Sequence, residues 1–173
     1  LRIFQKQLAE GKRLQPRDQY YYARELYYNG LYLRAIRELL DFLDSGRGWR
    51  ENCVSACQDL AACYYRVGEE TMALCALLRS FQFDNPRAEV CCDLGQHFYE
   101  REQYRQANYW YEMARTMTPD PTGGGFCRPD CYGFIPDLQL CMCHFKLGEL
   151  QKAEHYNQLA EQLKPEDQTV LHN

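Results

Sequence analysis

One pattern of helix, tight turn and helix recurs four times along this chain of 173 residues, and it constrains the fold more than any other feature. Each copy turns at Gly or a polar residue and has Ala five residues later. The turns fall at Gly30, Gly68, Glu102 and Gly148, and the alanines are Ala35, Ala73, Ala107 and Ala153. These alanines are 38, 34 and 46 residues apart, so the chain consists of near-regular units with extra residues in two places.

Such a pattern has a simple physical meaning. A single pair of helices cannot bury its apolar stripe, so neighbouring pairs must stack and cover one another. Where two helices cross closely, only a small side chain lets the backbones approach. Twelve residues before each alanine stands such a side chain: Ala23, Ala61, Gly95 and Cys141. The sequence therefore predicts an all-α array of stacked helix pairs.

The same features resemble the tetratricopeptide repeat family, whose period is 34 residues. Three places after the small residue, the family pattern has a large apolar or aromatic side chain; here Leu26, Tyr64, Phe98 and His144 stand there, and His144 departs from the pattern. The resemblance implies a right-handed solenoid of about four helix–turn–helix repeats. The expected boundaries are a capping or linker helix at 1–15 and a repeat domain at 16–173, with repeats at about 16–48, 50–84, 86–118 and 134–166 and an insertion loop at 119–133.

Composition and motifs exclude several classes of function. A net charge of −4 gives no electrostatic reason to bind nucleic acid. The apolar runs fall far short of the roughly 18 residues that a membrane span needs. No nucleophile elbow, zinc-protease motif, phosphate-binding loop or dinucleotide fingerprint occurs. We therefore expect a chain without catalytic residues or cofactor, and its start at Leu1 without Met indicates a fragment of a longer polypeptide.

Ten cysteines are many for a chain of this length. Most lie in helical segments, where a free thiol behaves as a small hydrophobic group. Burial is expected for Cys57, Cys63, Cys75, Cys91 and Cys141. The sequence thus favours a cytoplasmic protein with mostly reduced thiols.

The insertion offers a metal site as an alternative. Cys127 and Cys131 lie on it, and Cys141, Cys143 and His144 follow in the next helix. Together they contain enough donors for tetrahedral zinc, although the spacing is unlike a zinc ribbon. Free thiols are the main interpretation, and a disulfide between Cys127 and Cys131 is a further one.

The first helix of each repeat lines the concave face of such a solenoid, which is the usual ligand surface. One position of that helix is aromatic in all four copies: Tyr27, Tyr65, Tyr99 and Phe145. A row of rings suits a peptide or the faces of sugars, or else the rings pack between neighbouring helices. The predicted binding groove consists of Tyr20, Arg24, Tyr27, Tyr28, Gln58, Tyr65, Arg66, Gln96, Tyr99 and Phe145.

A narrower resemblance covers nearly the whole chain. The stretches that carry it are RDQYYYARELYYNGLYLRAI, ALLRSFQFDNPRAEVCCDLG and GFCRPDCYGFIPDLQLCMCHFKLGELQKAEHYN. They resemble the C-terminal repeat region of bacterial family-2 glycosyltransferases, which follows a catalytic domain that binds a nucleotide sugar. The resemblance implies a module that recognises a partner protein, a peptide or the glycan acceptor of that enzyme. A homodimerisation domain is the alternative. The chain has no Asp-x-Asp motif, so no catalytic residue is transferred.

Overall fold

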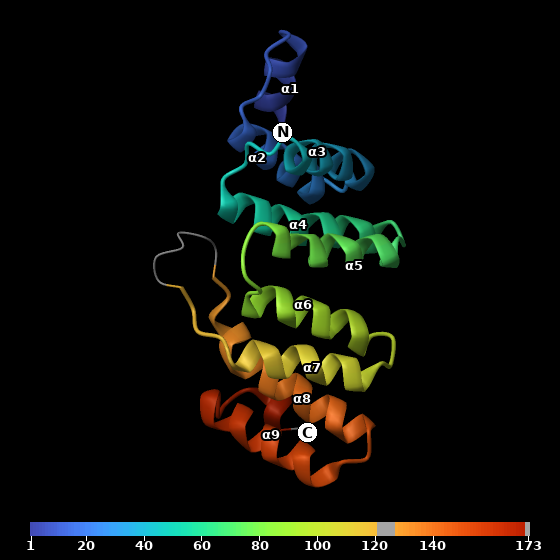
Figure 1. The fold of residues 1–173 in the computed structure, drawn as a ribbon, viewed down its shortest axis with the longest axis vertical. Coiled ribbons are helices and arrows are strands. Elements are labelled where there is room, and N and C mark those ends of the chain that lie inside the picture. Colours follow the sequence, from blue (N-terminus) through green and yellow to red (C-terminus); the bar gives the residue numbers. More distant parts are fainter. Residues whose placement is uncertain (121–126, 172–173) are drawn as a thin grey trace. The chain divides into compact units, whose positions relative to one another are not determined.

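A computed structural model describes residues 1–120 and 127–171, and in these residues all regular secondary structure is helical, with no strand. The helices fall into two compact units, residues 1–85 and residues 86–173 (Figure 1). The first unit contains α1 (Arg2–Ala9), α2 (Pro16–Tyr28), α3 (Tyr32–Asp44), α4 (Arg50–Arg66), α5 (Glu70–Arg79) and the 3-10 helix η1 (Ser80–Gln82). The second contains α6 (Ala88–Tyr99), α7 (Tyr104–Arg115), the 3-10 helix η2 (Pro129–Tyr132), α8 (Phe134–Lys146), α9 (Leu150–Leu163) and α10 (Gln168–Leu171).

The four expected helix pairs are present, two in each unit. Helices α2 and α3, α4 and α5, α6 and α7, and α8 and α9 pack against each other, and each pair is joined by a short turn. Below, the first helix of a pair is called helix A and the second helix B. Within each unit the pairs also contact each other, α3 with α4 and α7 with α8. The fold class predicted from the repeat is thereby confirmed.

The turn between helix A and helix B has the same backbone form in all four pairs. Gly30, Gly68 and Gly148 have φ values of 73°, 81° and 74°, the left-handed region in which glycine is unstrained. In the third pair Glu102 occupies this place with φ 57°, the one positive value at a non-glycine residue in the described part of the chain. Its amide donates to the Tyr99 carbonyl at 2.9 Å, as the Gly30 amide does to the Tyr27 carbonyl. The third turn is therefore built like the others, but with a strained residue.

This difference predicts that Glu102→Gly stabilises the second unit. A left-handed conformation costs an L-residue about 1–2 kcal/mol, and glycine avoids that cost while losing some of the gain to its greater freedom when unfolded. We expect the free energy of unfolding in urea to rise by about 0.5–1 kcal/mol. The matched control, Gly68→Ala in the first unit, should lower it by a similar amount. A stability lower than wild type for Glu102→Gly would contradict the assignment of strain.

The small residue expected where helix A crosses helix B is buried in each of the four pairs. Ala23, Ala61 and Cys141 are buried, and Gly95 of α6 lies directly against the ring of Tyr111 on α7. A Cβ atom on Gly95 would stand 2.6 Å from the nearest ring carbon, closer than atoms can approach. The third helix pair therefore needs glycine there because its partner is a tyrosine.

Two expectations from the sequence need correction or refinement, one about a cysteine and one about the insertion. Cys75 is exposed on α5, whereas Cys57, Cys63, Cys91 and Cys141 are buried as predicted. Helical periodicity alone did not decide between the two sides of α5. The insertion predicted as a loop at 119–133 contains the ordered helix η2, which packs on α6, α7 and α8. Its residues 121–126 lie outside the described part of the chain.

Candidate functional site

Helix A residues of the first unit form a connected group of aromatic, cationic and acidic side chains. The Tyr20 hydroxyl donates to Asp59 Oδ2 at 3.1 Å, and Arg24 Nε lies 3.5 Å from the same oxygen. Arg24 Nη2 also donates to the Tyr28 hydroxyl at 2.9 Å, and its guanidinium lies 5.7 Å from the ring centres of both Tyr20 and Tyr28. The arginine is thus held in place by α2 and α4 together.

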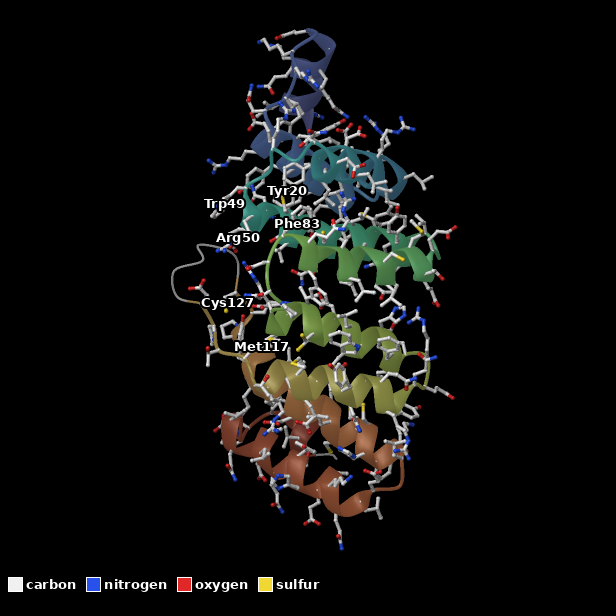
Figure 2. All side chains as sticks on the ribbon, viewed as in Figure 1. Tyr20, Trp49, Arg50, Phe83, Met117 and Cys127 are labelled. Atoms are coloured by element: carbon white, nitrogen blue, oxygen red, sulfur yellow. The ribbon has the colours of Figure 1, made fainter. Side chains whose placement is uncertain are left out.

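The members of this group differ in how much of each side chain is exposed to solvent. Tyr20, labelled in Figure 2, is only 2% exposed and packs against Phe42, so it supports the surface from beneath. Burial raises the pKa of the Asp59 carboxyl, and the cation of Arg24 opposes that rise. Tyr28 is 66% exposed and presents its ring to solvent. No sequence pattern marks Asp59 as a member of this group, because a lone acidic residue on helix A looks like an ordinary surface position.

The four aromatic residues of the repeated position divide between packing and exposure. Tyr27 contacts Tyr32 with ring centres 5.8 Å apart, and Tyr99 contacts Tyr104 at 5.5 Å. In both cases the ring rests on the first residue of helix B in its own pair. Tyr65 is half-buried, whereas Phe145 is 61% exposed. Tyr27 and Tyr99 therefore pack within their own repeats, whereas Phe145 presents its ring to solvent.

The other predicted groove residues are polar and lie on helix A as expected. Gln58 is half-buried and Arg66 exposed on α4. Gln96 is exposed on α6, where its amide donates to Glu100 at 2.9 Å and its oxygen accepts from Tyr111 at 3.3 Å. Two separate surfaces result, one on α2 and α4 in the first unit and one on α6 and α8 in the second.

The surface of the second unit contains a distinct pocket. A cavity of about 560 Å³ lies on α8 and α9, with Tyr99 of α6 at one side. Its lining is Tyr99, Cys141, Met142, Phe145, Lys146, Leu150, Ala153, Glu154 and Asn157. Tyr99 and Phe145 belong to the predicted groove, whereas Leu150, Ala153, Glu154 and Asn157 lie on helix B, where no groove position was expected.

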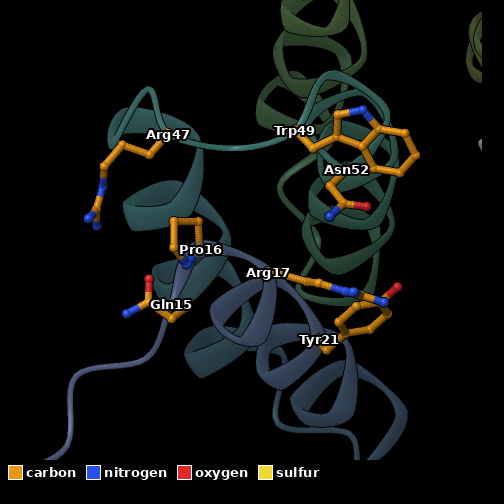
Figure 3. A pocket seen from close by; sticks show the side chains of 7 residues that line it. All are labelled: Gln15, Pro16, Arg17, Tyr21, Arg47, Trp49 and Asn52. Carbon is orange, nitrogen blue, oxygen red and sulfur yellow. The ribbon is translucent and has the colours of Figure 1, made fainter.

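Another pocket of about 510 Å³ lies near the starts of α2 and α4 in the first unit. Its lining is Gln15, Pro16, Arg17, Tyr21, Arg47, Trp49 and Asn52. In Figure 3, Arg17 extends along Tyr21 while Arg47 points away on the other side of the pocket. The two guanidinium groups do not converge, so the pocket is not built around a single anion.

The insertion is fixed to α6 by a buried carboxylate. Glu89 is 5% exposed, and its carboxylate accepts hydrogen bonds from the Arg128 amide at 3.0 Å and from the Tyr132 hydroxyl at 2.9 Å. Arg128 also pairs with Asp93 at 2.8 Å. Cys131 of η2 is fully buried beside Cys92, whose thiol donates to the Cys131 carbonyl at 3.7 Å. The end of the insertion is therefore part of the core of this unit.

The side chains proposed as zinc ligands do not all lie together, because each has its own neighbours in the unit. Cys131 and Cys143 belong to the apolar core, while His144 Nδ1 lies 2.8 Å from Glu149 and its ring stacks on Tyr156. Cys127 is exposed (Figure 2). Among residues 1–120 and 127–171, no group of three or more His, Cys, Asp or Glu is placed to hold a metal ion. Cys127 and Cys131 are free thiols rather than a disulfide.

Comparison with known proteins identifies the fold. The chain matches no protein-family model and no curated protein sequence. It is similar to the solved structure of PilF from Pseudomonas aeruginosa, with 16% identity and a TM-score of 0.65 over 91% of this chain and 65% of that one. It is also similar to the tetratricopeptide-like repeats of a kinesin light chain from Podospora anserina, with 16% identity and a TM-score of 0.59 over 88% and 78% of the two chains. The chain therefore has a tetratricopeptide-like fold, and it spans 65% of the length of PilF.

Within the residues that the structure describes, no helix combines the length and the apolar character that a bilayer crossing requires.

Proposed function

We propose that this chain is a non-catalytic, cytoplasmic binding module that recognises an extended peptide of a partner protein through its helix A surfaces. The observation that carries the proposal is the placement of Arg24. Its guanidinium is held by Asp59 and two tyrosine rings, so little side-chain entropy is lost when it binds a ligand. Arg66 adds a second cation on α4. This surface favours a peptide that carries a carboxylate near an apolar or aromatic residue.

We expect Tyr27→Ala combined with Tyr65→Ala to weaken peptide binding by at least tenfold. Each ring presents partly exposed apolar area, and its removal takes away contact without removing a fully buried core residue. Peptides selected from a random displayed library on the immobilised chain supply the probe, and isothermal titration measures their affinity. Circular dichroism checks that the helical content is unchanged.

Tyr109 provides the matched control, because it is 59% exposed and lies on α7, a helix B. Tyr109→Ala should leave the affinity of the selected peptides unchanged. If the double variant binds them as tightly as the wild type, the helix A assignment is refuted.

The resemblance to glycosyltransferase repeat regions supports a more specific proposal. In a parent enzyme of that kind, the same surfaces would hold the glycan acceptor, and the exposed ring of Tyr28 is suited to stack on a sugar face. A glycan array probed with this chain separates the two ligand classes. The parent reading frame tests the wider assignment, because a nucleotide-sugar-binding domain should precede Leu1.

Dimerisation of the parent enzyme is the alternative role. It predicts self-association of the chain at micromolar concentration, which light scattering detects directly. A mass that stays monomeric at all concentrations removes this alternative and leaves peptide or glycan recognition.

A further inference from the structure

The open pocket on α8 and α9 has a filled counterpart in the preceding repeat of the same unit. Phe145, Leu150 and Asn157 line the pocket. When the repeats are aligned on Ala107 and Ala153, these three residues correspond to Tyr99, Tyr104 and Tyr111. The two surfaces are therefore equivalent positions of successive helix pairs.

Helix α8 covers the counterpart surface. Cys143 of α8 is fully buried in one apolar cluster with Tyr111, and Tyr99 and Tyr104 pack against that cluster. Burial raises the pKa of all three phenols, and the Cys143 thiol adds to the rise. Cys143, near the C-terminal end of α8, thus fills this place in the third repeat. The fourth repeat has the same place without an occupant in the described residues.

The helix α10 shows which kind of element fits on this side of α8 and α9. It begins at Gln168, 34 residues after α8 begins at Phe134, which is the register of a fifth helix A. Val170 is 2% exposed and packs with Phe134, Leu138 and Ala160. The first turn of a helix therefore already rests on this surface, next to the open pocket.

The small side chain at one position of α9 explains why the pocket has space for a ligand. Position 157 is Asn, whereas the equivalent residue of the third repeat is the large Tyr111. The Asn157 amide donates to the Val170 carbonyl at 3.2 Å, so this side chain secures α10 and leaves the space above Ala153 unfilled. Small residues on the floor let a helix backbone approach closely.

We propose that this pocket binds an amphipathic α-helix of a partner protein, which packs on α8 and α9 beside α10. An apolar side chain of that helix enters the space between Phe145, Leu150 and Asn157. Lys146 and Glu154 lie among the lining residues and favour a helix with an acidic and a basic residue beside its apolar stripe. This interaction differs from the proposed peptide recognition because it requires a helical ligand and helix B residues of the second unit, and it shares Tyr99 and Phe145 with the predicted groove.

The test uses a displayed library of helical peptides with one randomised face, selected on the intact chain. We expect selected helices to bind at least tenfold more weakly to Leu150→Lys, because the substitution places a cation at the rim of the pocket. Leu150 is 61% exposed, so its replacement should not unfold the protein. Leu33→Lys is the matched control, since Leu33 is 72% exposed on α3, and it should leave binding unchanged.

Each other outcome overturns the proposal. A selection that yields no helix, or helices that bind Leu150→Lys as tightly as wild type, would show that the pocket is not a docking site. Self-association of the wild type that Leu150→Lys abolishes would assign the pocket to a second copy of this chain instead of a partner. The Tyr27→Ala and Tyr65→Ala variant should retain helix binding, so a failed peptide-groove proposal is recognised separately.

Discussion

Gly95→Leu is expected to lower the free energy of unfolding of the second unit by about 3 kcal/mol. The Tyr111 ring occupies the space directly beside Gly95 and is itself only 1% exposed, so it has no room to move aside. A larger side chain must either push α6 and α7 apart or expel the ring from the core. Urea unfolding followed by circular dichroism measures the loss.

A double variant tests whether that contact is the cause. Tyr111→Ala alone should cost about 3–5 kcal/mol, because it removes a buried ring. In Gly95→Leu with Tyr111→Ala, the new leucine fills part of the space, and we expect a favourable coupling energy of about 1–3 kcal/mol between the two sites. Strictly additive losses, or a Gly95→Leu variant as stable as wild type, would contradict the close crossing of α6 and α7.

Glu89→Ala should release the ordered end of the insertion from α6 and cost about 2–4 kcal/mol. The substitution leaves the Arg128 amide and the Tyr132 hydroxyl without their acceptor. Burying unsatisfied donors is unfavourable, so we expect η2 to open and expose Cys131. Ellman's reagent should then modify a third thiol quickly, besides Cys75 and Cys127, which are exposed in the wild type.

The control for this experiment is Glu100→Ala, because Glu100 is exposed at the end of α6. Its thiol reactivity and stability should match the wild type. Burial raises the pKa of the Cys57, Cys63, Cys91 and Cys143 thiols to about 12, so these stay protonated and slow to react at neutral pH in every variant that keeps its fold. Rapid modification of only two thiols in Glu89→Ala would contradict the anchoring role of Glu89.

The helix pairs were predictable from the sequence because their signals are local and repeated. A small residue at each crossing and a left-handed residue at each turn give the same pattern in four copies, including the turn at Glu102. The position of η2 was not predictable in this way. Its order depends on Glu89, which is 39 positions before Arg128, and no local pattern marks such a long-range contact.

The candidate site was predictable only in part, for a related reason. Periodicity places Tyr20 and Tyr28 on the same helix, but it does not show that Tyr20 is buried against Phe42 while Tyr28 is exposed. The contribution of Asp59 arises from the packing of α4 beside α2. The pocket on α8 and α9 results from Asn157, a polar residue that sequence alone assigns to an ordinary helix surface.

We propose that helix A residues of these repeats receive a peptide ligand. Hydrogen exchange of the chain with and without a library-selected peptide tests it most directly. We predict slower exchange on α2 and α4 around Tyr27 and Tyr65, with the exposed side of α7 around Tyr109 unchanged. Protection confined to the helix B segments, with α2 and α4 exchanging as in the free protein, would contradict it.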